Sequence, residues 1–254
     1  GKVVVYLRAG VVGARLECAG NALGRGAAKT ARRDRGARIQ QHPFGKILTA
    51  ERARLLSWFL VFFFSGYLFT GYVHVGSPTE GFLATSFDST VPLLTWSIWI
   101  YCIHFLVMIS SFFLIADPDS LRTFAGAVAI SLVVSFLIFF LFPTIYPRPC
   151  FSTDGATWFL WEALYFVDVR TNCFPSLHIA LASCYSYWLV KKGGNWRIAI
   201  LALFVMTSVS VLTTKQHYLV DIIGGVAVAI GAVYVSERVH RSRGRVSRTA
   251  EGPA

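Results

Sequence analysis

An imidazole and a carboxylate stand four residues apart at the start of a long apolar run, as His217 and Asp221. If the run is helical, the two side chains share one face, one turn apart. The carboxylate can then accept the imidazole N–H, fix its tautomer and leave the other ring nitrogen free as a nucleophile or base. The alternative is a pair that only ties up a helix end. Ionisable groups beside such apolar sequence are costly unless they pair or work, which favours a functional role.

Groups that suit a phosphate lie in three polar segments: the one at 215–221 that carries His217, and two earlier ones at 146–149 and 172–178. The start of a helix presents unpaired N–H groups, so Ser176 and its neighbours could bind a phosphate. Arg148 offers a planar fork for phosphate oxygens, and Lys215 offers a second cation. Together these residues compose an anion site.

The two histidines complete a reaction scheme for phosphoryl transfer. His217, oriented by Asp221, could attack phosphorus and form a phosphohistidine. His178 could protonate the leaving alkoxide and then activate the incoming water or alcohol. Taken singly, His178 is equally compatible with an interfacial histidine bonded to a loop carbonyl.

Three short motifs, within a resemblance that covers about residues 55–236, resemble those of the type 2 phosphatidic acid phosphatase superfamily: Arg148-Pro149, Pro175-Ser176-x-His178 and His217-x-x-x-Asp221. That superfamily includes membrane lipid phosphatases, lipid phosphotransferases and vanadium haloperoxidases. The resemblance implies that His217 is the nucleophile, Asp221 its partner and His178 the general acid/base. It also implies that Arg148 and Ser176 bind the phosphate.

The chain departs from the family pattern at three positions, with Leu141 in place of a Lys, Leu177 in place of a Gly and Val211 in place of an Arg. Two expected phosphate-binding cations are therefore absent, and Lys215 could replace one of them. The Pro-Ser-Leu-His and Gln-His-Tyr-x-x-Asp forms, with Asp88-x-x-x-Pro92, look more like the branch near inositol phosphorylceramide synthases. That branch transfers a phospho-headgroup between lipids.

Composition places the chain among integral membrane proteins. Of its 254 residues, 55% are hydrophobic and only 15% are charged, and the mean hydropathy is +0.56, which is unusual for a soluble domain. Much of the formal net charge of +11 lies in the two ends. Such ends suit cytosolic segments facing anionic lipid. The sequence lacks the interleaved basic and aromatic residues typical of an RNA-binding face, so we predict that the protein does not bind nucleic acid.

Six apolar segments approach the ~20 residues that cross a bilayer, at about 55–73, 93–115, 121–142, 175–190, 196–213 and 217–236. We therefore predict an all-α, polytopic bundle of six transmembrane helices over residues 55–236. The aromatic residues of 158–166 predict a short amphipathic helix at the extracytoplasmic interface, where it could roof a cavity or simply pack on the bundle.

The positive-inside rule orients this bundle. Most cations fall on one side, which predicts a cytosolic basic arm at 1–54 and a cytosolic basic tail at 237–254, both near anionic lipids. The opposite, extracytoplasmic side carries few cations: Arg148, Arg170 and Lys215. The three polar segments share that side, in a membrane that we expect to be the bacterial inner membrane.

The cysteines show no CxxC or zinc spacing, so the sequence predicts no metal site and no cofactor. Cys150 and Cys173 bracket one inter-span loop. In an oxidising compartment a disulfide between them would close the loop and hold the phosphate ligands, the alternative being two free thiols.

These patterns predict a membrane enzyme that hydrolyses a lipid phosphate or diphosphate through a phosphohistidine. A phosphotransferase that uses a lipid alcohol in place of water shares the first step. A third alternative is a proton-coupled transporter, because intramembrane His and Asp also mark proton relays; the absence of an inverted repeat disfavours it. The lipid and the oligomeric state stay open.

Overall fold

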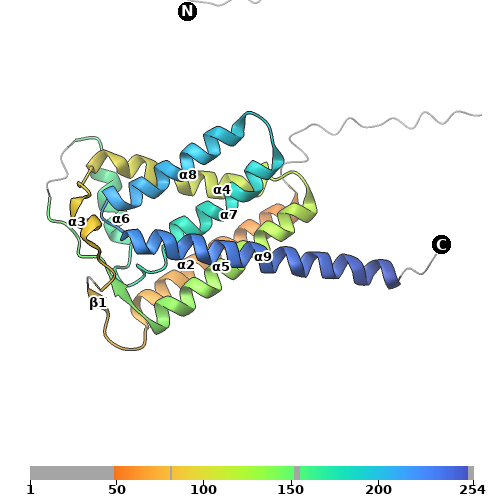
Figure 1. The fold of residues 1–254 in the computed structure, drawn as a ribbon, viewed down its shortest axis with the longest axis horizontal. Coiled ribbons are helices and arrows are strands. Elements are labelled where there is room, and N and C mark those ends of the chain that lie inside the picture. The colour runs from red at the N-terminus through yellow and green to blue at the C-terminus, as the bar shows by residue number, and fades with distance from the viewer. Residues whose placement is uncertain (1–48, 81, 152–154, 251–254) are drawn as a thin grey trace, which may run out of the picture. The chain divides into compact units, whose positions relative to one another are not determined.

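Helices dominate the computed structural model, which describes residues 49–80, 82–151 and 155–250 (Figure 1). In chain order the elements are α2 (Ala50–Tyr72), β1 (Thr79–Glu80), α3 (Ser86–Thr90), a 3-10 turn (Thr95–Ser97), α4 (Ile98–Leu114), α5 (Pro118–Leu141), β2 (Thr144–Ile145), α6 (Trp158–Val167), α7 (Leu177–Lys192), α8 (Trp196–Thr213) and α9 (Leu219–Ala250). The two short strands pair in parallel. Most of the predicted arm, residues 1–48, and the end of the tail, residues 251–254, lie outside the described residues.

Among the described residues, five helical segments are long and apolar enough to cross a membrane: Ala50–Tyr72, Thr95–Leu114, Pro118–Leu141, Trp196–Thr213 and Leu219–Arg243. They confirm an all-α membrane protein and match five of the six predicted spans. The predicted fourth span is α7, which has 16 residues and is therefore about 24 Å long, short of a ~30 Å hydrocarbon core.

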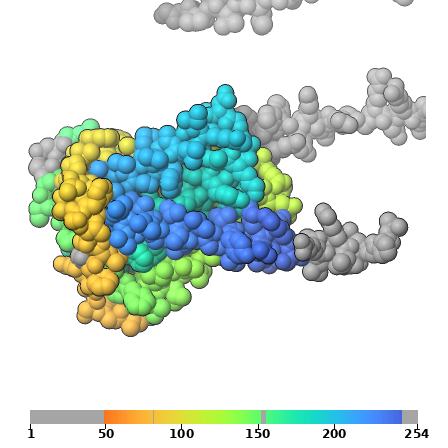
Figure 2. All heavy atoms as spheres, viewed as in Figure 1, coloured from red at the N-terminus to blue at the C-terminus, as the bar shows by residue number. Residues whose placement is uncertain are grey.

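The central position of α7 explains its different composition. It packs against α4, α5, α8 and α9, and most of its side chains are buried, including Tyr185 and Trp188. A helix enclosed by other helices needs no lipid-facing apolar surface. By contrast, α8 and α9 form much of the face seen in Figure 2 and expose large apolar side chains such as Ile198 and Ile230.

One end of the bundle gathers the cations that the sequence predicts on a common side. Arg52 is buried, and its guanidinium donates to the carbonyl oxygens of Phe112 at 2.7 Å and Ile115 at 2.9 Å, where α4 leaves its last carbonyls without helical partners. Two ion pairs join helices there, Arg122–Glu51 between α5 and α2 and Lys191–Glu237 between α7 and α9, and Arg241 pairs with the same Glu237 within α9. Two helices extend into the ranges predicted as arm and tail, since α2 begins at Ala50 and α9 runs to Ala250.

The predicted aromatic helix is α6. Its Trp161 is fully buried and donates from Nε1 to the Thr95 carbonyl at 3.0 Å, which fixes α6 against the start of α4. Phe166, on the same helix, is 91% exposed. The helix thus packs on the bundle with one side and presents aromatic rings outward with the other.

Candidate active site

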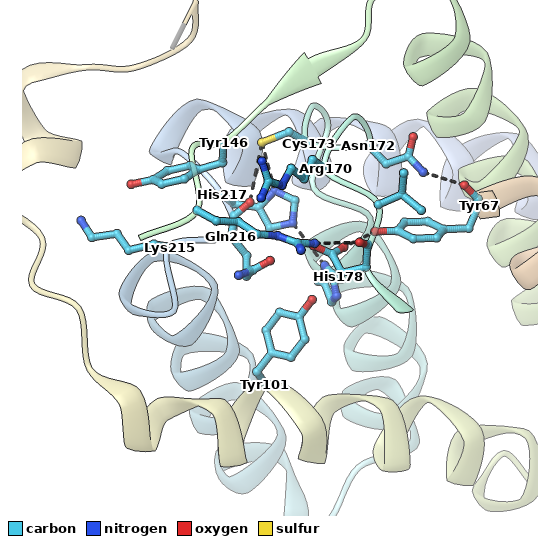
Figure 3. A pocket seen from close by; sticks show the side chains of 13 residues that line it. Tyr67, Tyr101, Tyr146, Arg170, Asn172, Cys173, His178, Lys215, Gln216 and His217 are labelled. Atoms are coloured by element: carbon cyan, nitrogen blue, oxygen red, sulfur yellow. Dashed lines mark hydrogen bonds and ion pairs between the residues drawn. The ribbon is translucent and has the colours of Figure 1, made fainter. Parts of the chain in front are cut away.

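A pocket of about 350 Å³, including its open mouth, lies near the starts of α4 and α7 (Figure 3). Arg52 is at the opposite end of the bundle, where it binds the last carbonyls of α4. Residues from the ends of α2, α4 and α7 and from the connecting loops line it: Tyr67, Tyr101, Tyr146, Arg148, Asp168, Val169, Arg170, Asn172, Cys173, His178, Lys215, Gln216 and His217. The three polar segments singled out in the sequence therefore meet in space.

His217 and Asp221 form the expected pair, although the helix begins two residues later than predicted. His217 precedes α9, which starts at Leu219. His217 Nδ1 lies 3.3 Å from Asp221 Oδ2, and both side chains are buried. The same carboxylate oxygen accepts the backbone N–H of Tyr218 at 2.8 Å. Asp221 thus fixes both the imidazole and the turn that carries it.

His178 faces His217 directly. Its Nδ1 lies 3.2 Å from His217 Nε2, so one of these two nitrogens must carry the shared proton. When His217 donates its Nδ1 proton to Asp221, its Nε2 is an acceptor and His178 Nδ1 is the donor. Asp221, His217 and His178 are then joined by consecutive hydrogen bonds, and the nucleophilic His217 Nε2 lies beside the proton donor His178 Nδ1.

Rings from α4 confine the His178 imidazole, a feature that the sequence analysis missed. The ring centroids of Tyr101, Phe105 and His104 lie 4.5, 5.3 and 5.7 Å from that of His178. These residues recur at i, i+3 and i+4, a spacing that puts them on one helical face. His104 is fully buried and its Nδ1 lies 3.4 Å from the Tyr185 hydroxyl.

Arg148 is held at the pocket by groups that the sequence does not identify. Its Nη2 donates to the Asp168 carbonyl at 2.7 Å and to the Asp168 carboxylate at 3.2 Å, and its guanidinium lies 4.5 Å from the centre of the Tyr165 ring. The Tyr67 hydroxyl also donates to Asp168. Arg148 Nε is buried without a hydrogen-bond partner among the described residues, which leaves one aligned donor for a ligand.

The other two cations differ in how free they are. The ammonium of Lys215 donates to the backbone carbonyls of Asp88, at 3.1 Å, and Val91, so it is engaged by the α3 segment. Arg170 is exposed, lines the pocket, and lies near His217 in Figure 3. Its guanidinium makes no hydrogen bond or ion pair with the described part of the chain. Of Lys215 and Arg170, therefore, Arg170 is the one whose donors are free to bind a ligand.

Ser176 lies beside the pocket and joins α7 to α9. It is fully buried, and its backbone N–H donates to the Asp221 carbonyl at 3.0 Å. That N–H is therefore not free for a phosphate, whereas its Oγ has no hydrogen-bond partner among the described residues. The link holds the start of α7, which carries His178, against the turn that carries His217.

The predicted Cys150–Cys173 disulfide is wrong in this structure, where both cysteines are free. Cys150 is exposed on the loop, whereas Cys173 is buried and points inward. The Cys173 thiol donates to Asp221 Oδ2 at 3.0 Å. Burial, and next the charge of Asp221, raise the pKa of this thiol well above its usual range, so it rests as a neutral donor. The Cys173 sulfur is therefore engaged with Asp221 and not bonded to Cys150.

Comparison with known protein families finds a match for most of the described chain. The family model of the PAP2 superfamily matches residues 74–235, which is more than half of the chain and contains every residue of the predicted site. No curated protein matches the chain.

Proposed function

We propose, from the premise that this chain belongs to the PAP2 superfamily, that it is an integral membrane lipid phosphatase acting through a phosphohistidine. Membership supports a lipid phosphatase or phosphotransferase, and the chain's own geometry supports the finer statement. The observation that carries it is the chain of contacts from Asp221 to His217, 3.3 Å, and from His217 to His178, 3.2 Å.

In the first step, His217 Nε2 attacks phosphorus while the bond from phosphorus to the lipid oxygen breaks. His178 enters this step as the imidazolium, with a proton on each ring nitrogen, and gives its Nδ1 proton to the departing alkoxide. Asp221 stabilises the positive charge that develops on His217. The products are the lipid alcohol and phosphorylated His217. His178 is left as the neutral imidazole with its proton on Nε2, so its Nδ1 is ready to act as a base.

In the second step, His178 takes a proton from water as the water oxygen attacks the phosphoryl group. The P–N bond breaks, inorganic phosphate leaves, and the electron pair returns to His217 Nε2. Both imidazoles then hold the protons with which the cycle began. One pair of side chains therefore serves both steps.

The groups that we assign to the phosphate oxygens are the free donors of the pocket. Arg148 Nε is oriented by the Asp168 contacts and lacks a partner among the described residues, and Arg170 projects into the same space. The Ser176 Oγ is a further donor. Lys215, whose ammonium is already bound by carbonyls, contributes its charge from a distance.

We further propose that the pocket opens at the extracytoplasmic face of a bacterial inner membrane. The cation-rich end of the bundle, around Arg52 and Lys191, would then face the cytosol, in accord with the positive-inside rule. The basic termini would lie near anionic lipid headgroups. The exposed rings of α6, such as Phe166, are placed to contact lipid beside the pocket.

Transfer to a lipid alcohol is the second candidate, and one observation favours it. The buried Oδ1 of Asn172 has no partner among the described residues, while Asn172 lines the pocket. This acceptor suits the hydroxyl of an incoming alcohol. Both reactions pass through phosphorylated His217 and differ only in what attacks it.

The experiment is an assay of the purified protein in detergent with a panel of lipid phosphates, with and without lipid alcohols. His217→Ala tests the nucleophile, and His240→Ala, in the distant part of α9, is the matched control. Phosphate release by the wild type and His240→Ala but not by His217→Ala supports hydrolysis. New phospholipid without phosphate indicates transfer. Neither product across the panel contradicts both and returns attention to proton-coupled transport.

A further inference from the structure

Cys173, His217 and Asp221 bring a sulfur, a ring nitrogen and a carboxylate oxygen together behind the pocket. All three are buried, and their possible ligand atoms lie within 4.8 Å of one another. Cys173 is 44 positions from His217 along the chain, so no local spacing in the sequence predicts this cluster. The short separations and the types of ligand atom indicate a possible metal site.

The separations are close to those that a tetrahedral zinc ion imposes. With metal–ligand distances of about 2.3 Å to sulfur and about 2.0–2.2 Å to nitrogen and oxygen, neighbouring ligand atoms lie roughly 3.2–3.6 Å apart. Here Cys173 Sγ is 3.0 Å from Asp221 Oδ2 and 3.9 Å from His217 Nδ1, and the nitrogen is 3.3 Å from the oxygen. Small side-chain rotations would bring the three to a common centre.

A second observation at the cluster is an unsatisfied acceptor. Asp221 is fully buried, yet its Oδ1 has no hydrogen-bond partner among the described residues. An unpaired buried carboxylate oxygen is costly and is expected to have a partner in some state of the molecule. Cys173 and His217 line the pocket, which provides a route for a small cation.

We propose that Cys173, His217 and Asp221 form a binding site for a soft or borderline divalent cation such as Zn²⁺ or Cd²⁺, and that occupancy of this site switches the enzyme off. The ion replaces the thiol proton of Cys173, which leaves to solvent, and the Nδ1 proton of His217, which moves to Nε2, so one proton is released overall. A thiolate selects such ions over Mg²⁺ or Ca²⁺.

Inhibition follows from imidazole chemistry. A neutral imidazole that gives its Nδ1 lone pair to a metal carries its proton on Nε2. Nε2 then has no lone pair to attack phosphorus. This consequence rests on the function proposed above, whereas metal binding itself does not.

The binding test uses the full-length protein in detergent without lipid, titrated with Cd²⁺ and followed by the ultraviolet cadmium–thiolate charge-transfer band. Cys173→Ser removes the sulfur, His217→Ala removes the nitrogen and keeps every cysteine, and Cys150→Ser is the control on an exposed thiol of the neighbouring loop. We expect a saturable band in the wild type and Cys150→Ser. We expect Cys173→Ser to lose it, and the affinity of His217→Ala to fall about tenfold or more.

A band that persists unchanged in Cys173→Ser, or equal affinity in His217→Ala, overturns the site. Thermal unfolding of each variant shows which ones are folded, and either folded variant decides the question alone. In the activity arm, Zn²⁺ should inhibit Cys173→Ser at least about tenfold more weakly than the wild type, each relative to its metal-free rate. If no lipid phosphate is turned over, the proposed function fails while the absorbance arm still decides the metal site.

Discussion

The carboxylate of Asp88 accepts a hydrogen bond at 2.8 Å from the backbone N–H of Leu219, the first residue of α9 and 131 positions later in the chain. It also accepts the backbone N–H and the hydroxyl of Thr85, at 2.7 and 2.6 Å. In the opposite direction, Lys215 donates to the Asp88 carbonyl. The α3 segment thus holds both ends of the turn that carries His217.

Replacing Asp88 by Asn should loosen this turn. The amide keeps the shape of the carboxylate but loses its charge and can accept fewer of the three donors, which should cost about 1–3 kcal/mol of stability. We expect a lower midpoint of thermal unfolding in detergent. Asp119→Asn, at an exposed carboxylate paired with Arg122, is the control and should shift the midpoint little. Equal midpoints for both variants would contradict the clamp.

The contribution of Asp88 should depend on pH. Burial raises the pKa of Asp88, but the hydrogen bonds from Thr85 and Leu219 and the charge of Lys215 outweigh it and lower the pKa below its ordinary value. A lowered folded pKa gives stability that is present above the unfolded pKa, about 3.9, and is lost as pH falls through the folded value. The gap in unfolding midpoint between wild type and Asp88→Asn should therefore be constant above about pH 5 and shrink below about pH 4. A gap that widens on acidification would show that the sign is wrong.

Two glycines of α9 make a matched pair for testing how closely α7 and α9 must approach. A Cβ on Gly225 would lie 2.5 Å from the Ser176 carbonyl oxygen and 3.0 Å from Ile179 Cβ, whereas a Cβ on Gly231 would meet nothing within 4 Å. Gly225→Ala should therefore push apart the helix starts that carry His178 and His217. We expect loss of stability by about 1–3 kcal/mol and a large loss of turnover.

Gly231→Ala should leave turnover unchanged, because the new methyl group lies on an exposed side of the same helix. Helix propensity favours the alanine by up to about 1 kcal/mol. Unfolding midpoints and phosphate release from both variants, measured side by side, provide the check. Full activity in Gly225→Ala would mean that the distance between α7 and α9 does not determine how His178 and His217 are placed relative to each other.

The parts of this molecule that local pattern encodes could be predicted from the sequence. Membrane-length apolar runs predict the helices, and the four-residue spacing predicts that Asp221 meets His217. The segment of α7 is shorter and more polar than the other predicted spans, because its side chains contact other helices rather than lipid.

Contacts between distant segments could not be predicted, because no periodicity records them. No pattern in the sequence around Asp168 predicts that it accepts hydrogen bonds from Arg148. Lys215 was expected to bind the phosphate. Its backbone φ of 56° instead places it in a tight turn, and its side chain reaches the carbonyls of the α3 segment. The disulfide prediction failed for the same reason, since proximity in the chain says nothing about the direction of Cys173.

His178 should matter most when the leaving group is poor. A lipid alkoxide needs a proton as it departs, so His178→Ala should slow hydrolysis of a lipid phosphate by about 10²–10⁴-fold. The aryl oxide of an activated aryl phosphate departs without a proton, so the formation of phosphorylated His217 from that substrate should be much less affected. Because the same variant lacks the base for the second step, phosphorylated His217 should accumulate, visible as a burst of the aryl alcohol and as an acid-labile phosphoprotein. Equal loss on both substrates without a burst would remove His178 as the general acid.

We expect substitution of Arg170 to weaken substrate binding and substitution of Lys215 to lower the stability of the fold. Arg170 has free donors at the pocket, so Arg170→Gln should raise KM for a lipid phosphate about tenfold, with little change in the unfolding midpoint because the side chain is exposed. Lys215→Met should instead lower the midpoint, because it leaves the carbonyls of Asp88 and Val91 without their donor. Steady-state kinetics and thermal unfolding of the two variants give the comparison. If Lys215→Met raised KM as much as Arg170→Gln while its midpoint stayed at the wild-type value, Lys215 would be a phosphate ligand after all, and the carbonyl contacts would be secondary.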